Sequence, residues 1–152
     1  MAQFVDINNR EGLRELLLSL DPETIPLWGK MKPQQMVEHL VEEVKWTNGK
    51  KIAKCDKSPE EAEKSKQRMV YTDTEISKNI FLEELPERYA FADIPIAVDH
   101  LMEELEDFDW YFKEPGVTSV HGGFGPLNHE EWVIYHGKHF THHLKQFGLW
   151  QA

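Results

Sequence analysis

Apolar residues recur at the spacing of an α-helix in four segments of the chain, and this periodicity constrains the fold more than any other feature. The segments cover about residues 9–20, 33–48, 95–113 and 128–147, and each gathers its apolar side chains on one face. No stretch shows the alternation of apolar and polar residues needed to build a sheet. The pattern therefore predicts an all-α fold, a four-helix bundle with one long crossover.

Residues that favour helix ends support these boundaries. Pro33 stands at the first position of the second segment, and Gly49 stands just past its end. Asn128 and Glu131 have the spacing of a capping box at the start of the fourth segment, and Gly148 follows its end.

The long connection between the second and third helices begins with a charged stretch. Seven of the 17 basic residues lie between Lys50 and Arg68. A short exposed helix can follow Ser58-Pro59, and we expect this stretch to add little to the core.

Length and charge limit the classes of function that this chain can have. The 152 residues, 40% of them hydrophobic, suit a single domain over residues 1–152. The net charge of −10 argues against a nucleic-acid partner, since phosphate binding needs basic surfaces. No apolar run approaches the roughly 20 residues of a membrane span, and residues 1–10 do not resemble a signal peptide. The one cysteine, Cys55, forms no intramolecular disulfide, so we expect a cytoplasmic protein without membrane contact.

Histidine is concentrated near the last predicted helix. Six of the eight histidines lie there: His121, His129, His136, His139, His142 and His143. At 100° per residue, His136, His139 and His143 share the apolar face with Trp132. The far side carries Lys138, Thr141 and Lys145. Burying three imidazoles without partners would cost about 1–3 kcal/mol each. Two explanations stay open: carboxylates or carbonyls bind the rings, or His139 and His143, four residues apart, bind a metal ion.

A pair of ligands on one helix needs others from elsewhere. His39 is the only histidine of the second predicted helix, and it lies away from the centre of its apolar face. Gln35, Glu42 and Trp46 share its flank and could orient a ligating imidazole. His39 is therefore either a third metal ligand or a partly exposed residue at the edge of the core.

Three motifs, in this order and spacing, resemble a known family. They are Trp28-Gly-Lys-Met-Lys-Pro-Gln-Gln-Met-Val-Glu-His39-Leu, His121-Gly-Gly-Phe-Gly-Pro-Leu, and Trp132 leading into His139-Phe-Thr-His-His143-Leu-Lys-Gln-Phe147. They resemble the DUF1569 family of the DinB/YfiT-like superfamily of metal-binding four-helix bundles, over about residues 26–48 and 121–148. Lys32 departs from the small hydroxyl residue often found before the proline.

The resemblance implies an up-down-down-up bundle in which His39, His139 and His143 bind a divalent metal, zinc or nickel. Three histidines plus water form an open site, as in catalytic zinc centres. Since relatives include thiol-S-transferases and hydrolases, the resemblance implies activation of water or a low-molecular-weight thiol for hydrolysis or S-transfer on a small-molecule substrate.

Two further expectations accompany the resemblance. His136, His142 and Glu42 are catalytic candidates, because they could orient ligands or move protons beside the metal. Relatives often form homodimers, and a homodimer is expected here by analogy. The alternative is a non-catalytic helical bundle that binds a metal or a protein partner.

Overall fold

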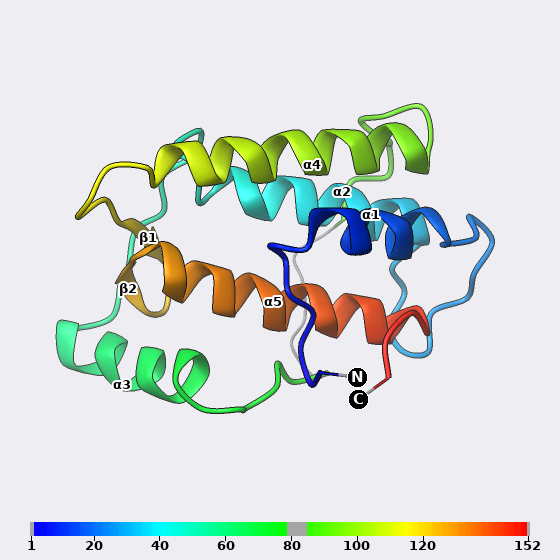
Figure 1. The fold of residues 1–152 in the computed structure, drawn as a ribbon. Coiled ribbons are helices and arrows are strands. Elements are labelled where there is room, and N and C mark those ends of the chain that lie inside the picture. The colour runs from blue at the N-terminus through cyan, green and yellow to red at the C-terminus, as the bar shows by residue number, and fades with distance from the viewer. Residues whose placement is uncertain (1, 79–84, 152) are drawn as a thin grey trace.

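The computed structural model describes residues 2–78 and 85–151 and shows a mostly helical protein (Figure 1). In these ranges the elements are α1 (Arg10–Leu18), α2 (Pro33–Lys45), α3 (Pro59–Val70), α4 (Ile94–Tyr111), β1 (Ser119–His121), β2 (Gly125–Leu127) and α5 (His129–Gln146). The four predicted helices form as α1, α2, α4 and α5, and the additional helix expected near Ser58-Pro59 forms as α3, which begins at Pro59. None of the helices in the described ranges is long and apolar enough to cross a membrane.

The helices begin where the sequence supplies a capping group. The Asn128 side chain accepts from the Glu131 N–H, and the Glu131 carboxylate accepts from the Asn128 N–H, which confirms the capping box of α5. Ser58 and Asp93 cap α3 and α4 with their side-chain oxygens, and α2 begins at Pro33.

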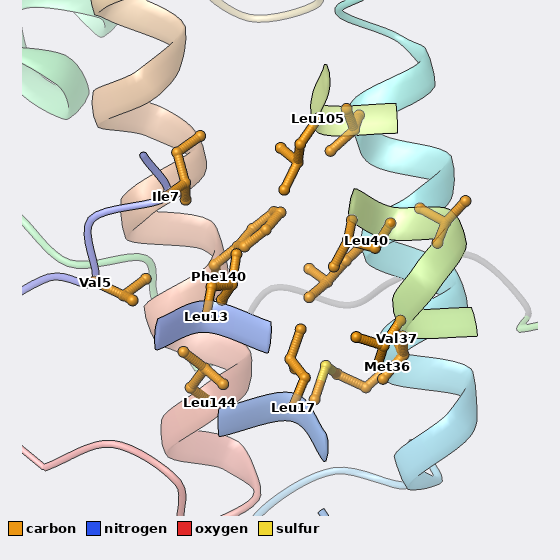
Figure 2. Packing of buried hydrophobic residues seen from close by; sticks show 14 of the residues in the cluster. Val5, Ile7, Leu13, Leu17, Met36, Val37, Leu40, Leu105, Phe140 and Leu144 are labelled. Carbon is orange, nitrogen blue, oxygen red and sulfur yellow. The ribbon is translucent and has the colours of Figure 1, made fainter. Parts of the chain in front are cut away.

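The core lies where the apolar faces of α1, α2, α4 and α5 meet (Figure 2). Its labelled members include Leu13, Leu17, Met36, Val37, Leu40, Leu105, Phe140 and Leu144, all 0–1% exposed. Helix α4 packs along α2 and also contacts α1. The apolar faces read from the sequence are therefore the faces that the protein buries.

A small hairpin corrects the expectation of a purely helical fold. No stretch was expected to form strands, but β1 and β2 pair antiparallel, with His121 opposite Gly125. Strands of three residues are too short to show alternation in a sequence. Contacts with other parts of the chain hold them instead: Leu127 is fully buried, and the Trp132 indole donates to the Ser119 carbonyl at 3.0 Å.

The connection after α2 contributes more to the core than its charge suggested. Ala62, Met69 and Val70 of α3 are buried. Tyr71, which follows α3, donates from its hydroxyl to the Glu131 carboxylate at 2.5 Å, and Lys66 pairs with that carboxylate at 3.1 Å. Helix α3 is thus attached to the start of α5.

Helix α5 is enclosed on the face that was expected to be exposed. Lys138 and Thr141 are 3% and 1% exposed. The Thr141 hydroxyl accepts from the Val5 N–H at 2.8 Å, and the Lys138 ammonium donates to the carbonyls of Thr72 and Thr74. A Cβ at Gly137 would lie 2.9 Å from the Val5 carbonyl oxygen. The N-terminal segment and the segment after α3 therefore cover this face (Figure 1), and glycine permits the close approach.

Candidate metal centre

Helices α2 and α5 bring three histidines together from distant parts of the chain. The Nε2 atom of His139 lies 3.2 Å from Nε2 of His39 and 3.1 Å from Nε2 of His143. One ring nitrogen from each of the three lies within 4.8 Å of the others. His143 is buried, and His39 and His139 are partly buried. We call this group the three-histidine cluster.

A glutamine fixes which nitrogen of His143 faces the cluster. Its Nδ1 atom lies 2.8 Å from Oε1 of Gln146, while Nε2 of Gln146 donates to the Trp28 carbonyl at 3.1 Å. Because the amide nitrogen is used at Trp28, the amide oxygen faces the ring, and His143 must carry its proton on Nδ1. Its Nε2 atom therefore presents a lone pair to the cluster.

A carboxylate favours the same tautomer in His39 as Gln146 does in His143. The Nδ1 atom of His39 lies 3.9 Å from a carboxylate oxygen of Glu43, one turn further along α2. This distance is too long for a hydrogen bond, but the negative charge favours the tautomer with its proton on Nδ1. The Nε2 atom of His39 then also presents a lone pair to His139.

Burial keeps the three imidazoles neutral. Desolvation, followed by the neighbouring His142, lowers the pKa of His39 to about 4. Desolvation, followed by His39, lowers the pKa of His143 to about 3. The pKa of His139 lies well below its usual value, from burial first and the other cluster histidines second. Near neutral pH all three are in the form that binds a metal.

The cluster fits a divalent cation. A tetrahedral ion bound at about 2.0–2.1 Å holds its nitrogen ligands roughly 3.3–3.4 Å apart. The two distances from His139, 3.1 and 3.2 Å, are close to this value, and the nitrogens of His39 and His143 lie within 4.8 Å of each other. Without an ion, the lone pairs of His39 and His143 both face His139 Nε2, which has at most one proton to donate. A cation satisfies all three nitrogens together. The cluster could therefore bind a metal ion, and imidazole suits zinc, nickel, copper and iron.

Two cavities reach the cluster. The larger, of about 550 Å³, is lined by His39 and by residues 85–91 except Glu87. The smaller, of about 170 Å³, is lined by His139, His121 and Tyr135 among others. Glu43 lines both.

The catalytic candidates named from the sequence lie around the cluster rather than within it. Glu42 lines the larger cavity and forms ion pairs with Lys45 and Lys51. His142 is next to His143, with ring centroids 5.0 Å apart, but lines a separate cavity beside Trp28.

His136 lies one turn before the cluster, in the core. It is 1% exposed, and its Nε2 atom lies 3.0 Å from the Thr47 hydroxyl. Its Nδ1 atom has no hydrogen-bond partner, although the ring stacks on Trp132 and lines the smaller cavity. Gln35 also lies outside the cluster and accepts the backbone N–H of Lys32.

Two residues beside the cluster, Glu43 and Gln146, were not predicted from the sequence. Glu43 follows His39 by four residues and Gln146 follows His143 by three, so each shares a helix face with its histidine. These two spacings were the sequence features that could have identified Glu43 and Gln146.

Replacing Gln146 with leucine is expected to lower zinc affinity by about 10–100-fold, because the variant no longer holds His143 in the tautomer that faces the cluster. Competition with a chromophoric chelator measures this. Gln34→Leu is the matched control: it removes another buried amide, one that donates to the Glu38 carboxylate and the Phe91 carbonyl and bonds to no histidine of the cluster. Equal losses in both variants would contradict the role given to Gln146.

Comparisons with known proteins identify no family: no protein-family model, curated protein or solved structure matches the chain. The mostly helical fold and the three-histidine cluster agree with the resemblance to the DUF1569 family without establishing it.

Proposed function

We propose that the protein is a metal-dependent enzyme of the DinB/YfiT-like type, with zinc or nickel held by His39, His139 and His143. Its reaction is hydrolysis or S-transfer on a small molecule. The observation that carries the proposal is the convergence of three neutral imidazole nitrogens at 3.1 and 3.2 Å. The orientation of His143 by Gln146 adds support, since ligating histidines usually bind an acceptor through their other nitrogen.

Three neutral ligands leave the charge of a bound divalent ion uncompensated, so the ion would lower the pKa of a water or thiol beside it. The residues of the chain supply the rest. The cavity of about 550 Å³ next to His39 has the size of a small-molecule site. Burial, followed by Glu42, raises the pKa of the Glu43 carboxyl, which suits Glu43 to accept a proton at the junction of the two cavities.

The same proposal assigns a topology. Helices α1, α2, α4 and α5 would form the up-down-down-up bundle, and the connection that contains α3 would be the long crossover. The core that these four helices share supports this assignment.

The test is an activity panel on chelated and metal-loaded protein. One set of assays measures the coupling of glutathione, cysteine or coenzyme A to an electrophilic aryl chloride. The other measures the hydrolysis of nitrophenyl esters and amides. We expect turnover that depends on zinc or nickel and is lost in His39→Ala. His129→Ala is the control, because His129 pairs with Asp109 away from the cluster. If the wild-type protein binds stoichiometric metal but reacts no faster than His39→Ala, the result would favour the non-catalytic alternative.

A further inference from the structure

A third cavity, of about 340 Å³, lies beside the C-terminal half of α5. It is lined by Phe4 from the N-terminal segment and by Trp150 from the C-terminal segment. These segments are in contact, since the Trp150 indole donates to the Gln3 carbonyl at 3.3 Å. Its lining combines three lysines and one glutamate with the aromatic rings of Phe4, Trp28 and Trp150.

The charges that line this cavity are predominantly positive. Lys145 is neutralised by Glu75 at 2.5 Å. Among the residues that the structure describes, neither Lys78 nor Lys138 forms an ion pair with a carboxylate. The cavity therefore has two cations in excess on a chain whose net charge is −10.

Lys138 is the more unusual of the two cations. It is 3% exposed, and its ammonium group donates to the carbonyls of Thr72 and Thr74. The Asp73 carboxylate attracts this ammonium group electrostatically but does not form an ion pair with it. An ammonium group has three protons, so one remains for a further acceptor. A buried charge without a paired charge is costly, and an anion in the cavity would offset that cost.

Aromatic rings stand next to both unpaired lysines. The Lys78 ammonium lies 4.5 Å from the centroid of the Trp28 ring, and that of Lys138 lies 5.2 Å from the Phe4 ring. Trp150 adds a third ring to the wall. Flat apolar walls beside cations suit a ligand with a ring and a negative charge, and the volume lies within the range of small-molecule sites.

We propose that this cavity binds a small molecule that combines one aromatic ring with one anionic group, a carboxylate or a phosphate. Lys78 and Lys138 bind the anion, and the ring packs against the aromatic wall. The proposal does not depend on the activity assigned to the three-histidine cluster.

The test follows tryptophan fluorescence while one of four probes is added: benzoate, phenyl phosphate, benzyl alcohol or inorganic phosphate. Chelator is present throughout, because benzoate and phosphates also bind metal ions. We expect one of the two ring anions to bind at least about tenfold more tightly than benzyl alcohol and inorganic phosphate, as the loss of a charged hydrogen bond predicts. Which ring anion binds better identifies the anionic group.

Lys78→Gln is expected to weaken binding of that ring anion about tenfold. Lys78 is exposed, so the variant should fold normally. Lys113→Gln is the matched control, since Lys113 also lies over a tryptophan, 3.6 Å from the Trp110 ring, but away from the cavity. Benzyl alcohol binding as tightly as the ring anions, no saturable binding by either ring anion, or equal effects of the two substitutions would each overturn the proposal.

Discussion

Replacing His139 with alanine is expected to abolish stoichiometric metal binding. Its Nε2 atom is the one within 3.2 Å of both other cluster nitrogens, so the substitution leaves His39 and His143 on different helices without the ligand between them. The loss of affinity should exceed the roughly 10–100-fold typical of removing a group that only orients a ligand. Elemental analysis of the purified protein, followed by zinc titration against a chromophoric chelator, measures both quantities.

His100→Ala provides the control for this experiment. His100 lies on α4 next to Glu103, and its side chain is 46% exposed. Its removal tests whether the loss of a histidine outside the cluster also lowers the metal content. Circular dichroism checks that both variants retain the helical fold. A full equivalent of metal in folded His139→Ala would rule out the three-histidine cluster as the metal site.

Local patterns predicted the elements of this fold well where one face of a helix meets the core. The stripe on α2 is an example, since Met36, Val37 and Leu40 are all buried as their spacing predicted. The hairpin escaped prediction because its strands depend on distant contacts, such as that of Ser119 with Trp132.

The outer face of α5 shows the limit of a helical wheel. The wheel placed Lys138 and Thr141 on the side opposite the apolar face, which is usually the side that faces solvent. In the structure their polar atoms form hydrogen bonds with backbone groups of Val5, Thr72 and Thr74. A polar residue can be buried when a distant segment supplies its partner, and a single helix does not reveal that segment.

The cluster was predictable to different degrees. His139 and His143 are four residues apart on one apolar face, which indicated a site from the sequence itself. His39 lies 100 residues from His139, and only the family resemblance selected it over the alternative of a boundary residue. The roles of Gln146 and Glu43 required the positions of the ring nitrogens, which a sequence does not provide.

Buried histidines are also expected to make the metal-free protein sensitive to acid. Burial, followed by His121 and Arg10, lowers the pKa of His136 to about 3. The unfolded chain protonates this residue near its ordinary value of 6.5, whereas the folded chain does so only near 3. The stability that neutral His136 contributes is therefore complete above about pH 6.5. It falls by about 1.4 kcal/mol per pH unit as the pH drops from there toward 3.

His136→Met should remove this part of the acid sensitivity. Methionine fills a similar volume among the aromatic rings, and Thr47 keeps its hydrogen bond to the Val44 carbonyl at 2.8 Å. We expect similar free energies of unfolding at pH 7.5, and an advantage of about 3 kcal/mol for the variant by pH 4.5. Urea unfolding in chelator at several pH values measures both, with His100→Met as the exposed control. If plots of the free energy of unfolding against pH are parallel for wild type and His136→Met, His136 takes up its proton equally in the folded and unfolded states. That result would contradict the effect given to its burial.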